Sequence, residues 1–460
     1  MRSVVLLDDT SGNKMRTTVK FLYALPLVLS LLSLTYAQQL EKDIDKSRDN
    51  GIKMLKVVKE QLRKNYYDPK FHGVDLDQRF GLAEEKIKQA TTGGQVIGVI
   101  AQAILDLNDS HTVLIPPLKE SVAIYGWRML MVGDRCYVTS VMPGSDAETK
   151  GLATGDRIHA LDGNEPTRDT MWKMKYYYYS LRPKSRIKVT FENPEGQTHE
   201  IEVLTKLEKR HFEVLPGMLL EGGRISPELG PVMATNTIFE EFGSDLIIYR
   251  FASFNIAPDD VGKMMKKVAG HKTAILDLRS NPGGRTDTLE KVVGYFFDHE
   301  VKVGDFKQRQ TTKEIRIKPR SNAYTGQLIV LVDSQSSSAA EIFARLIQLE
   351  KRGTVIGDQT SGMVMESRRF DYELGSSTNP VLYGLSITDA DILMSDGKSL
   401  EAVGVTPDKL MLPAAEDLRQ HRDPVLAYAA LLAGVELSPE KAGALFAPKN
   451  DKPRDKSTNR

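Results

Sequence analysis

The chain has 460 residues, enough for two to four domains. Hydrophobic residues make up 41% and charged residues 27%, which excludes fibrous and wholly disordered classes. Lysine and arginine number 62 against 61 aspartates and glutamates, so no overall field gathers nucleic acid. The single cysteine, Cys136, excludes an intramolecular disulfide and a cysteine-rich zinc site. Because Cys136 falls in a strand-like run, we expect it to be buried.

The N-terminal segment has the pattern of an export signal. Residues 21–36 are apolar, Arg16 and Lys20 precede them, and small residues lead up to Ala37. A basic region, an apolar core and small residues before a break are typical of a signal peptide. We therefore expect residues 1–37 to be a leader that is cleaved after Ala37, with the folded part exported to the periplasm or the cell exterior. The alternative is an uncleaved membrane anchor, although the apolar core is slightly short for spanning.

Regions of different pattern follow, and together they predict an α/β multidomain fold. Residues 38–117 repeat apolar positions at three- and four-residue spacings, which indicates a small helical domain. Residues 120–207 contain short β-like runs between glycine and proline turns, which indicates a compact β-rich domain. Residues 208–430 alternate strand and helix, which favours a largely parallel sheet. Residues 449–460 are polar and charged, and we expect a disordered tail over residues 445–460.

Individual elements can be placed within these regions. In the β-rich region the expected strands are residues 136–141, 157–161, 186–192 and 199–204. In the alternating region the expected strands are residues 246–251, 273–278, 328–333 and 354–358. The amphipathic helices between them are expected over residues 258–269, 286–297 and 339–351.

Three turns in the alternating region carry groups that could do chemistry. Residues 277–284 end in two glycines before a helix, where backbone N–H groups can face an anion, although an ordinary strand-to-helix turn has the same pattern. Ser338 stands at a strand-to-helix junction, where a hydroxyl can be exposed beside an oxyanion donor. Glu341 also makes Ser338 a candidate helix cap. The third turn, residues 396–408, holds Glu401, which by itself is a loop carboxylate.

In this order, the three turns resemble those of the carboxy-terminal processing (tail-specific) serine peptidases, which include the tricorn core. The D-L-R-x-N-x-G-G turn, the S-x-S-A-[SA]-E junction and the E-x-x-G-V-x-P-D close are jointly specific, and the resemblance covers about residues 50–412. It implies a catalytic core built as a ClpP/crotonase-like β-α-β superhelix, and a PDZ domain over residues 120–207. The stretch that would cradle a substrate's terminal carboxylate is Tyr125, Gly126, Trp127, Arg128 and Met129.

The resemblance also bears on the base that would activate the serine. Many members use a lysine after the nucleophile's helix, but that position holds Met363, whose thioether cannot accept a proton. The tricorn-like branch uses Ser-His-Glu, which implies Ser338 as nucleophile, His111 as base and Glu401 as the group that orients the imidazole. His111 as an ordinary loop histidine stays the alternative. The implied oxyanion donors are the backbone N–H groups of Ala339 and of Gly283 or Gly284.

The implied function is an exported serine endopeptidase that hydrolyses proteins recognised by their C-terminal tails through the PDZ domain. The alternative is a catalytically inactive peptide-binding homologue with the same fold. Neither function needs a metal or an organic cofactor. The expected partners are protein or peptide substrates with free C-termini and a second copy of the chain in a homodimer. A membrane is a partner only through an uncleaved leader, and nucleic acid is not a partner.

Overall fold

The computed structural model describes residues 42–117, 121–209, 238–376 and 379–446. The predicted leader lies outside the described residues, as do residues 447–460 of the predicted tail. The prediction that the tail begins at residue 445 is wrong by two residues, because Leu445 ends a helix and Phe446 packs against the apolar core. Within the described ranges, no helix combines the length and the apolarity needed to cross a membrane.

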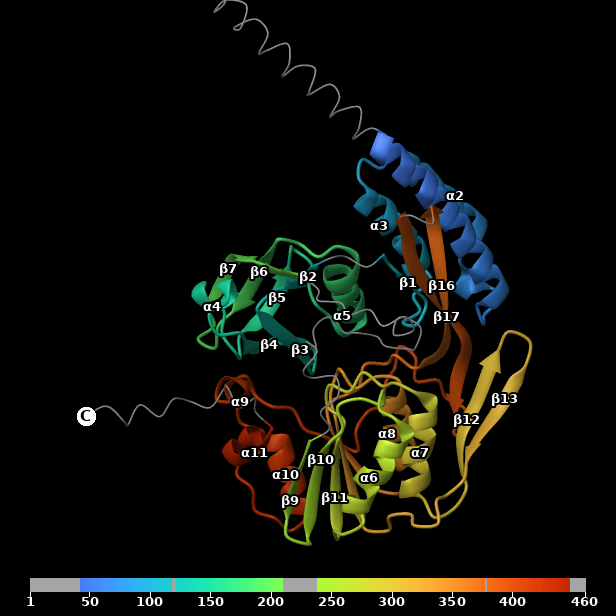
Figure 1. The fold of residues 1–460 in the computed structure, drawn as a ribbon. Coiled ribbons are helices and arrows are strands. Elements are labelled where there is room, and N and C mark those ends of the chain that lie inside the picture. Colours follow the sequence, from blue (N-terminus) through green and yellow to red (C-terminus); the bar gives the residue numbers. More distant parts are fainter. Residues whose placement is uncertain (1–41, 118–120, 210–237, 377–378, 447–460) are drawn as a thin grey trace, which may run out of the picture.

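The fold is mixed α/β, with helices and several sheets (Figure 1). The largest sheet has six strands in the order β18-β15-β14-β11-β10-β9, and every neighbouring pair is parallel except β9 with β10. Its strands are β9 (Ile238–Phe242), β10 (Leu246–Arg250), β11 (Thr273–Asp277), β14 (Gln327–Val332), β15 (Thr354–Gly357) and β18 (Lys409–Leu410). The four strands predicted in this region are therefore confirmed.

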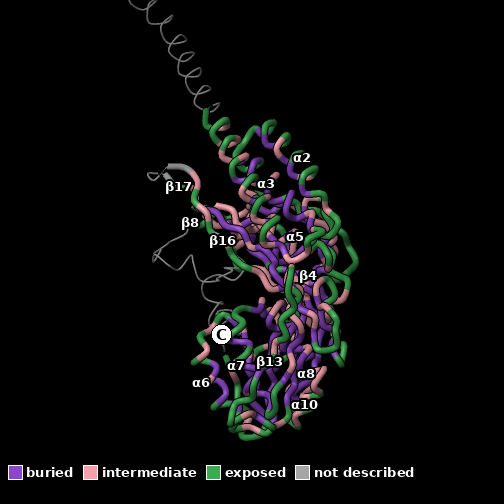
Figure 2. The backbone as a smooth tube through the Cα atoms, turned by 90° about the vertical axis from the view of Figure 1, so that its right-hand side faces the viewer, coloured by how far each residue is buried: buried purple, intermediate pink, exposed green. Residues whose placement is uncertain are grey.

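Helices cover both faces of this sheet, which explains its continuous apolar strands. One face packs against α6 (Pro258–Val268), α7 (Thr286–Phe296) and α8 (Ala339–Leu349), which confirms the three predicted helices. The other face packs against α10 (Pro424–Leu432) and α11 (Pro439–Leu445), which follow the short α9 (Ala415–Arg419). Figure 2 shows many buried positions in the part of the molecule that holds α8 and α10.

A second sheet, which is antiparallel, was not predicted. It consists of β1 (Val113–Ile115), β12 (Val301–Gln308), β13 (Thr312–Ile317), β16 (Met365–Ser376) and β17 (Asn379–Met394). The predicted N-terminal helices form over residues 42–65, α2 (Leu76–Lys88) and α3 (Gly93–Leu105), followed by β1; a short 3₁₀ turn, η1, covers Phe71–Gly73. These helices share one apolar core with Tyr383, Leu385 and Ile387 of β17. The N-terminal helices are thus packed onto the long β16–β17 hairpin of the alternating region.

The β-rich region folds around its own apolar core. Five antiparallel strands follow in the order β3 (Trp127–Val132), β4 (Arg135–Val141), β5 (Arg157–Leu161), β6 (Arg186–Glu192) and β7 (Thr198–Leu204). The helical segments are α4 (Asp146–Thr149), α5 (Arg168–Lys175) and the π-helix η2 (Tyr176–Leu181), and β2 (Ser121–Ile124) pairs with β8 (Lys206–Lys209). Cys136 is 2% exposed, as predicted, and burial raises the pKa of its thiol to about 12.

Candidate functional site

The turn after β11 owes its shape to buried polar side chains. Arg279 pairs with Asp277 at 2.8 Å and with Asp423 at 2.7 Å. Burial acts to raise the pKa of Asp277, but the Arg279 guanidinium outweighs it and holds the pKa below its usual range. The fully buried Asn281 donates from Nδ2 to Phe251 O at 2.6 Å and accepts the Gly283 N–H at 2.8 Å. The polar residues of the D-L-R-x-N-x-G-G motif therefore fix the turn.

The two glycines bring this turn against the predicted nucleophile. Gly283 has φ 83°, and a Cβ there would lie 2.7 Å from Ser338 Cβ and 2.9 Å from Ala339 N, so a side chain is excluded. The Gly283 N–H is already bonded to Asn281. The N–H groups of Gly284 and Ala339, in contrast, have no acceptor among the residues that the structure describes. Of the two predicted glycine donors, Gly284 is the one left for an oxyanion.

Ser338 begins α8 in a strained backbone conformation, with φ 55° and ψ −119°. Such strain at a strand-to-helix junction is a feature of exposed serine nucleophiles. The Ser338 N–H donates to Glu341 Oε2 at 3.0 Å, as expected of the predicted capping box, and to Met363 O at 3.0 Å. The side chain is half-buried and lines a small pocket, about 40 Å³ in volume, that is open to solvent.

Glu341 has a larger role than the capping that the sequence indicated. Its carboxylate is fully buried and accepts the backbone N–H groups of Gly362 at 2.8 Å and Met363 at 3.0 Å, and the Ser361 hydroxyl at 3.1 Å. Burial raises its pKa in spite of these bonds. Glu341 thereby ties the segment around Met363 to α8. The position that holds lysine in many relatives carries no base here.

His111 and Glu401 come together through Ser110, which sequence reasoning missed. Ser110 donates its N–H to Glu401 Oε1 at 3.0 Å and its hydroxyl to Glu401 Oε2 at 3.1 Å. The same hydroxyl lies 2.8 Å from His111 Nδ1. A hydroxyl has one proton, so when Glu401 is ionised the Ser110 Oγ that donates to its carboxylate accepts from Nδ1–H. His111 then carries its lone pair on Nε2. Glu401 thus reaches His111 through the Ser110 hydroxyl.

The turn that holds His111 is built by Asp109. Asp109 Oδ1 accepts the backbone N–H groups of His111 at 2.9 Å and Thr112 at 3.1 Å, and the Thr388 hydroxyl of β17 at 2.7 Å. Asp109 and His111 are buried, at 1% and 5% exposure. Burial, followed by the charge of Asp109, raises the pKa of Glu401 to about 7.

One short segment joins the Glu401 cluster to the nucleophile. Glu401 Oε2 accepts the Val364 N–H at 2.8 Å, and the preceding residue, Met363, accepts the Ser338 N–H at 3.0 Å. The groups predicted to form a Ser-His-Glu set are thus anchored to two consecutive residues. Among the described residues, no group of three or more histidine, cysteine or acidic side chains is arranged to hold a metal ion.

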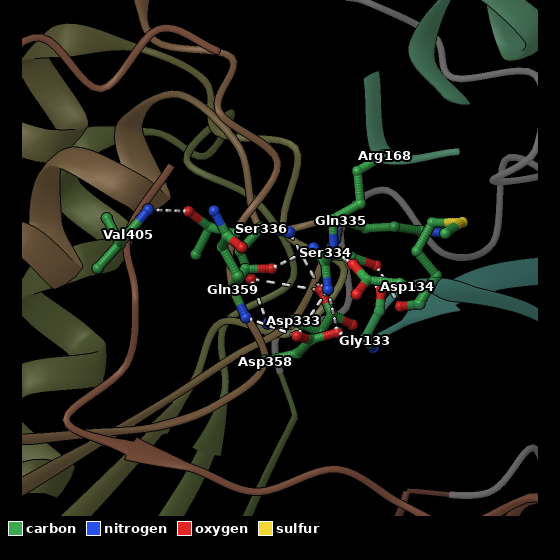
Figure 3. Close-up of polar contacts among 12 residues, drawn as sticks. Gly133, Asp134, Arg168, Asp333, Ser334, Gln335, Ser336, Asp358, Gln359 and Val405 are labelled. Atoms are coloured by element: carbon green, nitrogen blue, oxygen red, sulfur yellow. Dashed lines mark hydrogen bonds and ion pairs between the residues drawn. The ribbon is translucent and has the colours of Figure 1, made fainter. Parts of the chain in front are cut away.

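The β-rich unit is fastened to the loop that leads to Ser338 (Figure 3). Ser334 donates to Met131 O at 2.6 Å, and Gln335 Nε2 donates to Met129 O at 3.0 Å. Arg168 at the start of α5 donates from Nη2 to both carboxylate oxygens of the buried Asp358, at 2.7 Å each. These contacts place the edge strand β3 against the nucleophile loop.

The side chains of the predicted carboxylate cradle are mostly buried. Tyr125, Trp127 and Met129 belong to the apolar core of the β-rich unit, whereas Arg128 is exposed. Gly126 has φ 82°, and a Cβ there would lie 2.5 Å from Ser145 Cβ, so this position needs glycine. The cradle can therefore offer its backbone and Arg128, but not an apolar Met129 side chain.

A strained serine at a helix start within a mixed α/β fold is a feature of serine hydrolases. Residues 246–411 match the model of Peptidase family S41. The chain is 26% identical over 436 residues to the Tail-specific protease of Haemophilus influenzae, covering 87% of this chain and 59% of that protein. It is 26% identical over 285 residues to the Probable CtpA-like serine protease of Staphylococcus aureus, covering 62% and 51%. The chain thus spans between half and three fifths of these relatives.

Solved structures support the fold. Mature CPAF superposes with a TM-score of 0.61 at 16% identity, over 81% of this chain and 94% of that chain. CPAF complexed with lactacystin gives a TM-score of 0.60, also at 16% identity, over 81% and 95%. The fold of the described residues is therefore shared with CPAF.

Proposed function

We propose that the chain is a serine endopeptidase in which Ser338 is the nucleophile and His111 the general base. The observation that carries this proposal is the line of hydrogen bonds from Glu401 through Ser110 to His111, at 3.1 Å and 2.8 Å. These bonds orient the imidazole through Nδ1 and give its positive charge a route toward a carboxylate. Met363 cannot serve as the base, so the imidazole has no amine competitor at that position.

The reaction follows acyl transfer. Nε2 of His111 takes the Ser338 hydroxyl proton while Oγ attacks the substrate carbonyl, and the N–H groups of Ala339 and Gly284 receive the oxyanion. The imidazolium, stabilised by Glu401 through Ser110, then gives its proton to the leaving amine. Water, activated in turn by His111, hydrolyses the acyl-enzyme. Losing one oxyanion donor raises such a barrier by about 3 kcal/mol.

We further propose that residues 120–207 form a PDZ-like domain that captures substrate tails, beside the helical domain (38–117) and the catalytic domain (208–430). The edge position of β3 supports this role, because an extended peptide can be added to an edge strand once the Met129 and Met131 carbonyls exchange their present partners for it. The contacts of Ser334 and Gln335 with β3 support delivery of the captured chain toward Ser338. Export after cleavage of the leader is part of the same proposal.

Hydrolysis of an unfolded protein with a free or an amidated C-terminus tests these statements together. We expect cleavage by the wild type, none by Ser338→Ala, and slower cleavage of the amidated substrate. The inactive peptide-binding homologue, which Met363 favours, predicts no cleavage but retained binding of free-tail peptides. Equal cleavage of both substrates would argue against tail recognition and leave the peptidase assignment intact.

A further inference from the structure

The pocket beside Ser338 lies between helices α7 and α8 and the antiparallel sheet. Nine of its lining residues are apolar: Leu289, Val303, Phe306, Ile315, Ile317, Ala339, Ile342, Met365 and Ile392. The remaining wall consists of Gly284, Thr286, Ser338 and two carboxylates, Glu290 and Glu366. The lining is therefore mostly apolar, and its only charged side chains are the two carboxylates.

Glu366 is the carboxylate that the fold aims at this pocket. It lies on β16 opposite Ala390 of β17, and the register of the two strands shifts between Glu366 and Ser367. A bulge of this kind re-aims side chains and is common next to active sites. Glu366 is half-buried, follows the pocket residue Met365, and shares the wall with Ser338, whereas Glu290 on α7 is exposed.

The surroundings leave the charge of Glu366 unbalanced. The cation nearest to it in sequence, Arg368 on the same strand, already pairs with Asp389 of β17 at 2.5 Å. Asp389 adds a second negative charge from that strand, Glu290 adds a third from α7, and no lysine or arginine lines the pocket. Burial, then repulsion from Asp389, raises the pKa of Glu366 to about 7. The empty pocket thus lacks a cation.

We propose that this pocket receives the substrate side chain on the N-terminal side of the scissile bond, and that Glu366 makes it select arginine or lysine. This inference rests on the proposed peptidase function, because it concerns the same Ser338 site. The apolar walls contact the methylene groups of a long basic side chain, which buries its stem and keeps its charge at the end. The Glu366 carboxylate then receives the guanidinium or ammonium group.

The test uses matched peptides. Cleavage sites in an unfolded protein are first mapped by mass spectrometry, and one peptide is then made with arginine, citrulline or norleucine before the cut. Citrulline has nearly the shape of arginine without its charge. At pH 8 we expect kcat/KM for arginine to exceed that for citrulline by about 30-fold, as for the loss of one partner of a buried charge pair. Glu366→Gln is expected to lower this ratio to about one.

The control variant is Glu373→Gln, which removes an exposed carboxylate from the same strand and is expected to leave the ratio unchanged. Equal cleavage of the arginine and citrulline peptides by the wild type overturns the inference while the peptidase function stands. A ratio that survives in Glu366→Gln overturns it too. If the wild type cleaves no protein or peptide, the proposed function itself fails, and the inference falls with it.

Discussion

Replacing Ser110 with alanine tests the link between Glu401 and the imidazole. The substitution removes the Ser110 Oγ contacts with Glu401 at 3.1 Å and with His111 Nδ1 at 2.8 Å. Glu401 stays anchored, because the backbone N–H groups of residue 110 and of Val364 still donate to it at 3.0 Å and 2.8 Å. The substitution therefore removes the hydrogen bond to the imidazole without releasing Glu401. A hydrogen bond that involves a charged group contributes about 1.5–3 kcal/mol, so we expect kcat to fall roughly 10- to 150-fold.

The assay is peptide hydrolysis under saturating substrate, so that kcat and KM are separated. Thr112→Val is the matched control, because the Thr112 hydroxyl is equally buried but contacts Thr388 of β17 at 3.1 Å. We expect this control to lower thermal stability and to leave kcat within about twofold of the wild type. An unchanged kcat in Ser110→Ala, or an equal loss in Thr112→Val, would refute the relay.

Three further predictions concern stability, the labelling of Ser338 and the attachment of the β-rich unit. The pKa of Glu366 is raised from 4.5 to about 7, so the folded state loses stability as the pH rises from 4.5 through 7. In urea unfolding across that window, we expect the free energy of unfolding of Glu366→Gln to exceed that of the wild type by up to about 3 kcal/mol. Glu373→Gln, at an exposed position, should show no such gain, and an equal gain in both variants would contradict the prediction. Gly283→Ala should abolish Ser338 labelling by a fluorophosphonate, since its Cβ would lie 2.7 Å from Ser338 Cβ, and retained labelling would contradict the tight approach. Asp358→Ala removes the carboxylate that pairs with the half-buried Arg168 at 2.7 Å, which should accelerate amide exchange in β3 but not in β14; unchanged exchange would count against the fastening contacts.

Local patterns were enough to predict four of the six strands of the largest sheet, but not β9 and β18. Strands β11 and β14 are unbroken apolar runs, and each leads into a helix with period 3.6, which is the pattern of parallel strands covered on both faces. Ser338 could be singled out because the strand-to-helix junction is itself a local feature. The hairpin β16–β17 was not predicted, because its apolar core is completed by N-terminal helices that are distant in sequence.

The relations that define the candidate site are tertiary. Ser110 and Glu401 are 291 residues apart, and nothing in either segment indicates that a serine hydroxyl stands between the histidine and the carboxylate. Glu366 lies in a strand of alternating polar residues, a pattern that indicates a solvated face. Its position in the Ser338 pocket depends on a bulge and on helices from elsewhere in the chain. Met129 was a candidate pocket residue, but strand alternation turns its side chain into the core.

The most direct test of the central claim is the rate at which a fluorophosphonate labels Ser338 in His111→Ala. A general base contributes about 10²- to 10⁴-fold, so we expect a loss of that size, with Ser338→Ala showing no labelling. Met363→Leu should label at the wild-type rate, because the thioether takes no part in proton transfer. Labelling of His111→Ala as fast as the wild type would contradict the account.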